Sequence, residues 1–143
     1  MADVEAILTN SEKETSAAGE RLAARLRAGD VLLLHGDLGA GKTAFVRGMA
    51  EGLGADPADV SSPTFTILQQ YPGTPMVYHA DLYRLSGGGD ERELGLEELP
   101  GPRGVLAVEW AERLSRPPWE RAIRVDLEHA GADTRHLRVE TEP

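Results

Sequence analysis

The chain has 143 residues, which is typical of one domain, and its 41% hydrophobic and 27% charged residues exclude a disordered protein. Fifteen basic residues against twenty-four acidic ones give a formal net charge of −9, which disfavours autonomous nucleic-acid binding. The chain has no cysteine, so disulfides, thiolate metal sites and cysteine nucleophiles are excluded. The N-terminus lacks the pattern of a secretory signal, and no apolar run approaches the roughly 20 residues that span a bilayer. We therefore expect a cytoplasmic protein that does not bind membranes.

Hydrophobic periodicity and turn residues predict helices that alternate with strands. The start of the first helix rests on Ser11 and Glu14, which have the spacing of a capping box. The predicted elements are, in chain order, a helix over about 12–28, a strand over 31–34, a helix that ends at 54, a loop over 55–63, strands over 64–71 and 76–79, a loop with a short helix over 86–104, a strand over 105–108, and two strands joined by a turn at 131–133.

Two of these strands, 31–34 and 105–108, are unbroken apolar runs, which is typical of strands covered on both faces. The last two strands alternate apolar and polar residues across a short turn, which predicts an antiparallel hairpin. Buried strands that alternate with helices favour an α/β fold. We therefore expect residues 1–143 to form a single domain, a three-layer α/β sandwich with a mixed central sheet and a C-terminal antiparallel hairpin.

The turn between the first strand and the second helix carries the motif G-x-x-x-x-G-K-[ST] of the P-loop. Its residues, all predicted to contact nucleotide phosphates, are Gly36, Asp37, Leu38, Gly39, Ala40, Gly41, Lys42 and Thr43. Glycines let backbone N–H groups converge on phosphate oxygens, and the positive end of the following helix points at them. Lys42 adds a charge beside the β and γ phosphates, and the Thr43 hydroxyl suits Mg²⁺. The motif predicts a P-loop NTPase-like fold that binds ATP and Mg²⁺, and no Asn-Lys-x-Asp segment supports guanine recognition.

A P-loop needs a carboxylate at the end of a neighbouring buried strand. Asp81 follows the predicted strand over 76–79, and Glu109 ends the strand over 105–108. One of the two carboxylates would hold the Mg²⁺ shell, and the other would orient the attacking water. The residues alone leave open which does which. They indicate a Mg²⁺-dependent ATPase or a nucleotide switch.

Four segments, in this order and spacing, carry a resemblance to a known family. They are GDLGAGKT at 36–43, SPTF at 62–65, HADLYRL at 79–85 and EW at 109–110. Together they resemble the TsaE family, also called YjeE, of small bacterial P-loop ATPases, over about residues 8–140. The sequence departs from the family pattern at 86–89, where Ser-Gly-Gly-Gly replaces the more helical, acidic stretch that many relatives carry.

The resemblance implies a function in making threonylcarbamoyladenosine on tRNA. It implies TsaB and TsaD as protein partners, whose complex the chain would bind while it hydrolyses ATP, without itself transferring the threonylcarbamoyl group. Hydrolysis is expected to be slow in the absence of these partners. The net charge of −9 agrees with a protein that meets protein partners and leaves tRNA to a more basic companion.

The resemblance also implies residue roles. Lys42, Asp81 and Glu109 are the expected catalytic residues; Glu109 would hold Mg²⁺ together with the Thr43 hydroxyl, and Asp81 would be needed for hydrolysis. The segments at 62–65 and from Asp81 onward would be switch loops. Two further positions, Glu12 and Arg135, match family positions near the nucleotide.

Two other functions remain alternatives. One is a nucleotide-dependent adaptor that binds partners in the ATP state and does not require hydrolysis. The other is a small-molecule kinase, which the short chain disfavours because it leaves little length for a substrate lid.

Overall fold

The computed structural model describes residues 3–36, 41–60, 68–82, 95–114, 118–119 and 121–141. The elements within these ranges are β1 (Asp3–Thr9), α1 (Glu12–Ala23), β2 (Val31–Gly36), α2 (Lys42–Gly52), the 3-10 helix η1 (Pro57–Asp59), β3 (Leu68–Tyr71), β4 (Met76–Asp81), the 3-10 helix η2 (Leu96–Glu98), β5 (Gly104–Glu109), the 3-10 helix η3 (Ala111–Arg113), β6 (Ile123–His129) and β7 (Arg135–Thr141). No helix among the described residues is long and apolar enough to cross a bilayer.

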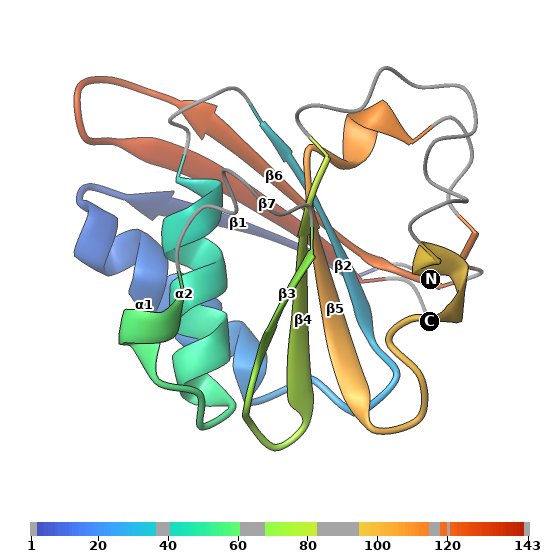
Figure 1. Ribbon diagram of the computed structural model, residues 1–143. Helices are drawn as coiled ribbons and strands as arrows, with labels where there is room; N and C mark the ends of the chain where they lie inside the picture. Colours follow the sequence, from blue (N-terminus) through green and yellow to red (C-terminus); the bar gives the residue numbers. More distant parts are fainter. Residues whose placement is uncertain are drawn as a thin grey trace.

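The seven strands form one mixed sheet in the order β1-β7-β6-β2-β5-β4-β3 (Figure 1). The four central strands β6, β2, β5 and β4 run parallel, while β7 pairs antiparallel with both β6 and β1, and β3 pairs antiparallel with β4. The predicted mixed α/β sheet with a C-terminal antiparallel hairpin is therefore confirmed. Because the central strands are parallel, their carboxyl ends meet at one edge of the sheet.

Alternate residues of the central strands point to two separate apolar clusters. Leu32, Leu34, Val105 and Ala107 belong to the cluster that α1 and α2 cover. Helices α1 and α2 lie side by side on this face (Figure 1). The opposite face packs Val31, Leu106 and Val108 against residues of η2 and η3, with Trp119 beside them. Strands covered on both faces explain the unbroken apolar runs, and the second outer layer is built of 3-10 turns.

Helix α1 begins where the capping box predicts. The Ser11 Oγ accepts a hydrogen bond from the Glu14 N–H at 3.0 Å, and the Glu14 carboxylate accepts one from the Asn10 N–H at 3.2 Å. The helix ends at Ala23, earlier than the predicted residue 28. Hydrogen bonds between residues three apart tighten the chain after it, and they still bring Leu26 into the core.

Strands β1 and β4 differ from the prediction, and one predicted strand is described only in part. Strand β1 was not predicted, although it pairs with β7 along its whole length, from Asp3 opposite Thr141 to Thr9 opposite Arg135. Strand β4 continues to Asp81, so this residue belongs to the strand and does not follow it. The strand predicted over 64–71 is described from residue 68 onward, and residues 64–67 lie outside the described part of the chain.

Candidate functional site

The candidate site lies at the carboxyl edge of the parallel strands. Strand β2 ends at Gly36, and helix α2 begins at Lys42, so the P-loop motif joins the end of a buried strand to the start of a helix. Strand β5 is the neighbour of β2 and ends at Glu109. Strand β4 lies beside β5 in a register that places Asp81 next to Glu109. The fold therefore brings both predicted carboxylates to the edge where the motif begins.

Thr43 and Glu109 are in direct contact, although 66 residues separate them in the sequence. The Thr43 hydroxyl lies 3.1 Å from Glu109 Oε1 and 3.2 Å from Oε2. Glu109 is only 3% exposed, which is uncommon for a carboxylate without polar partners. A hydroxyl and a carboxylate from facing elements thus form a compact group of hard oxygen atoms.

Lys42 is buried, with 4% exposure, at the first turn of α2. Its ammonium donates a hydrogen bond to the Gly36 carbonyl at the beginning of the motif, and it lies 3.7 Å from the centre of the Trp110 ring. That distance is typical of a cation–π contact. Trp110 reaches this position with a left-handed backbone, φ 59°, which is rare for a bulky side chain and is found at functional sites.

Behind Glu109, a buried chain of polar groups crosses from β5 to β3. The His79 Nε2 contacts the Glu109 carboxylate, and the His79 Nδ1 lies 2.9 Å from the Tyr71 hydroxyl, which in turn donates to the Gln69 amide oxygen. His79 has no exposed surface, and Tyr71 is 3% exposed. Buried polar atoms are costly unless they are paired, so this chain satisfies the His79 ring on both nitrogens.

Gly41 precedes Lys42 and has φ +100°, a conformation that L side chains rarely adopt. A Cβ there would lie 3.3 Å from Thr15 Cγ2 in helix α1 and 3.7 Å from Leu127 Cδ2 in β6. The Thr15 hydroxyl is paired with the buried Thr9 hydroxyl at 2.7 Å. The motif is thus packed against the junction of β1 and α1, next to the start of the helix that carries Glu12.

Glu12 and Arg135 lie near the same edge of the sheet. Glu12 is in the first turn of α1 and forms an ion pair of 3.3 Å with Arg47 of α2. Arg135 opens β7, and its guanidinium donates to the carbonyls of Ala132 and Thr134. The Thr134 hydroxyl also donates to the Asn10 side chain at 3.2 Å, which ties the β6–β7 turn to the start of α1. The predicted contact of Glu12 and Arg135 with the nucleotide stays a prediction.

Several predicted site residues lie outside the described part of the chain. These are Asp37, Leu38, Gly39 and Ala40 of the motif, the SPTF segment at 62–65, the end of the HADLYRL segment at 83–85, and the SGGG stretch at 86–89.

The donor set at the edge of the sheet fits a magnesium ion. Mg²⁺ prefers oxygen ligands and is commonly held by one or two protein groups, with phosphates and waters completing its shell. Thr43 and Glu109 supply such oxygens. Within the described ranges, no cluster of three or more His, Cys, Asp or Glu side chains is arranged to hold a metal by itself. The pair suits a metal that arrives with a phosphate ligand.

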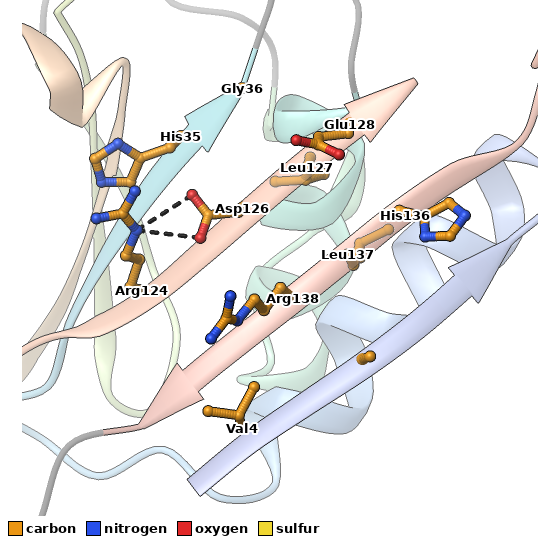
Figure 2. Close-up of a pocket in the computed structure, with 11 residues that line it drawn as sticks. Val4, His35, Gly36, Arg124, Asp126, Leu127, Glu128, His136, Leu137 and Arg138 are labelled. Atoms are coloured by element: carbon orange, nitrogen blue, oxygen red, sulfur yellow. Dashed lines mark hydrogen bonds and ion pairs between the residues drawn. The ribbon is translucent and has the colours of Figure 1, made fainter. Parts of the chain in front are cut away.

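A hollow of about 660 Å³ lies on the sheet face formed by β1, β7 and β6, beside the end of β2 (Figure 2). Arg124, Asp126, Glu128 and Arg138 line it, so its formal charges cancel. His35 projects into the same hollow from β2. Burial lowers the pKa of His35 below its usual 6.5, and the nearby Arg124 lowers it further. This hollow contains none of the predicted catalytic side chains.

The fold and the site define an α/β protein that carries a P-loop motif at the carboxyl edge of a mixed sheet. The family model described as "Threonylcarbamoyl adenosine biosynthesis protein TsaE" matches residues 9–137. The chain belongs to the TsaE family.

Individual relatives agree with this assignment. The chain is 42% identical over 130 residues to the tRNA threonylcarbamoyladenosine biosynthesis protein TsaE of Bacillus subtilis, covering 90% of this chain and 80% of that protein. It is 45% identical over 129 residues to the protein of the same name from Streptomyces coelicolor, covering 85% and 86%. The crystal structure of Bacillus subtilis YdiB matches with a TM-score of 0.77 and 36% identity, over 99% of this chain and 87% of that one.

Two contacts of the site were not predicted from the sequence. One is the link of Tyr71 and Gln69 with Glu109 through His79, and the other is the contact of Trp110 with Lys42. The one feature of the sequence that pointed to the first contact was His79, which stands two residues before Asp81. Alternate residues of a strand share a face, so His79 and Asp81 point to the same side of the sheet.

Proposed function

We propose that the chain is a Mg²⁺-dependent ATPase that acts with TsaB and TsaD in the biosynthesis of threonylcarbamoyladenosine on tRNA. The observation that carries the ATPase proposal is the contact of Thr43 with Glu109 at the start of α2, with Lys42 beside it. The tRNA pathway and the partners rest on membership of the TsaE family.

The residues divide the chemistry between them. Backbone N–H groups at the start of α2 and the Lys42 ammonium bind the phosphate chain and balance its charge. Thr43 and Glu109 would hold Mg²⁺, which when bound neutralises charge on the triphosphate. Asp81 lies beside Glu109 in the register of β4 and β5, which suits it to orient the attacking water.

The test is ATP turnover measured with and without TsaB and TsaD from the same organism. We expect slow release of free phosphate by the chain alone and faster release with both partners. Asp81→Ala should bind ATP and fail to turn it over. Lys42→Ala should bind ATP about tenfold more weakly or worse, because a charged hydrogen bond contributes roughly 1.5–3 kcal/mol.

Three outcomes would contradict the proposal. Phosphate transferred to an acceptor, instead of released, would identify a kinase. A variant without hydrolysis that still supports tRNA modification through many cycles would identify an adaptor. Turnover that survives in Asp81→Ala would remove the role given to Asp81.

A further inference from the structure

The Glu109 carboxylate is buried and meets two partners on opposite sides. On one side lies the Thr43 hydroxyl of α2, and on the other lies His79 of β4. The last side-chain torsion of a glutamate, which turns the carboxylate, has a broad range of angles unless the carboxylate oxygens are held. Here the His79 Nε2 contacts Oε2, one of the two oxygens that Thr43 also contacts. The imidazole is therefore placed to set how the carboxylate faces Thr43.

His79 is itself held from behind. Its Nδ1 lies 2.9 Å from the Tyr71 hydroxyl of β3, and that hydroxyl is hydrogen-bonded to Gln69 of the same strand. Gln69 stands directly opposite His79 in the antiparallel register of β3 and β4. Because an ionised carboxylate can only accept, a hydrogen bond between it and the ring requires the proton on Nε2. The Tyr71 hydroxyl donates its one proton to Gln69, so toward the remaining ring nitrogen it presents its oxygen as an acceptor.

We propose that His79 is a positioning residue which, backed by Tyr71 and Gln69, fixes the Glu109 carboxylate in the orientation that binds the divalent cation together with Thr43. The inference rests on the proposed function, since it concerns the same metal site. It extends the site from the edge of the sheet through three neighbouring strands. The chain of contacts ends at β3, which is an edge strand.

A histidine that only fills the core would have a different signature. Its replacement would lower stability but leave metal affinity unchanged in the molecules that fold. Groups that orient a metal ligand from behind typically change metal affinity by about 10–100-fold when they are removed. The dependence of nucleotide binding on Mg²⁺ therefore separates the two roles, and it does so without an activity measurement.

The experiment measures ADP affinity by calorimetry over a series of Mg²⁺ concentrations and in EDTA. We call the Mg²⁺ concentration that gives half of the change in ADP affinity the Mg²⁺ midpoint. His79→Asn retains a polar group near the Nδ1 position but cannot reach Glu109, so the Mg²⁺ midpoint should rise about 10–100-fold. The ADP affinity in EDTA should stay at the wild-type value. His79→Gln can present an amide N–H near the Nε2 position. It should recover most of the loss.

A milder pair of variants covers the case in which His79→Asn does not fold. Tyr71→Phe removes one hydroxyl from the chain and should raise the Mg²⁺ midpoint several-fold. Tyr78→Phe makes the same change on β4, on the opposite face of the sheet, and should leave the midpoint unchanged. Circular dichroism and thermal unfolding establish which variants are folded.

The possible results separate the two proposals. Folded His79→Asn and Tyr71→Phe proteins with the wild-type Mg²⁺ midpoint would overturn the positioning role alone. A wild-type protein that binds no ADP at any Mg²⁺ concentration would overturn the proposed function, and the positioning role with it.

Discussion

Trp110 shows how one residue links backbone strain to the site. It directly follows Glu109 and has φ 59°, the one positive φ among the described residues other than glycine. A left-handed backbone costs an L side chain about 1–2 kcal/mol, and the structure tolerates it because the ring then covers the Lys42 ammonium at 3.7 Å. Strain of this kind next to the Glu109 carboxylate supports a functional role for the turn at Trp110, which joins β5 to η3.

Two substitutions at Trp110 separate the strain from the ring. Trp110→Ala and Trp110→Gly both remove the contact with Lys42, but only glycine relieves the left-handed conformation. Trp110→Gly should therefore be more stable than Trp110→Ala by about 1 kcal/mol in urea unfolding. An alanine variant as stable as the glycine variant would show that the turn carries no strain.

His35 gives the stability a predictable dependence on pH. Burial and Arg124, with a smaller effect of Lys42, lower its pKa, while Glu112 and Asp126 partly oppose them. Its pKa in the folded state thus lies below the unfolded value of 6.5, so the unfolded chain binds more protons as the pH falls. The stabilisation is complete above pH 6.5 and is lost toward the lower folded pKa.

The corresponding measurement is thermal unfolding between pH 7.5 and 5. The wild-type melting temperature should fall below about pH 6.5, and His35→Gln should flatten the part of the decline that belongs to this residue. Parallel profiles for the two proteins would contradict the lowered pKa of His35.

At the scale of elements, the two helices depend on close contact through glycine. A Cβ on Gly48 of α2 would lie 1.7 Å from the Ser16 carbonyl oxygen of α1, and one on Gly19 would lie 2.1 Å from the Phe45 carbonyl oxygen. Both obstacles are backbone atoms, so neither can be avoided by a change of rotamer. The small residues therefore set the distance between α1 and α2.

Gly48→Ala tests this contact against helix propensity. Propensity alone predicts that alanine stabilises a helix by about 1 kcal/mol over glycine. We expect the clash to dominate and to lower the free energy of unfolding by about 1–3 kcal/mol or more. Gly52→Ala is the matched control, because its nearest obstacle is the Ala23 Cβ at 2.6 Å, and it should lose less. A stabilised Gly48→Ala protein would contradict the packing.

The elements that local patterns predict well are those whose signals lie within the element. The apolar runs of β2 and β5 and the alternation in β6 and β7 correspond to strands of the structure. Strand β1 was missed because its partner, β7, lies at the other end of the chain, and because Val4 and Leu8 remain exposed, at 51% and 54%. An edge strand with an exposed apolar face has little periodic signal.

In the site, too, contacts that follow from local patterns were predicted, and contacts that depend on strand pairing were not. The motif and the strand ends predicted that Asp81 and Glu109 lie near Lys42 and Thr43, because parallel strands bring their carboxyl ends to one edge. The pairing of Thr43 with Glu109 in particular came from the family resemblance. The contact of His79 with Tyr71 depends on the pairing of β3 with β4. No spacing within a single element encodes that contact, so the sequence alone did not predict it.

At the scale of the whole molecule, net charge sets what the chain can bind unaided. The formal charge is −9, and the isoelectric point is about 4.9. Proteins that bind nucleic acid without sequence preference do so with dissociation constants of roughly 10⁻⁴–10⁻⁶ M at physiological salt. We expect the isolated chain to bind tRNA more weakly than this range in fluorescence anisotropy. Tight binding that weakens steeply with added salt would reveal a basic surface and contradict the expectation.

Phosphate binding by the motif is tested by calorimetric titration of ATP into the wild-type protein and into Lys42→Ala, both in the presence of Mg²⁺. We expect one ATP per wild-type chain, and an affinity about tenfold or more lower for the variant, because the variant lacks the ammonium that binds the phosphates. Wild-type protein that takes up no ATP, or a variant with unchanged affinity, would contradict the claim that this edge of the sheet is a phosphate site.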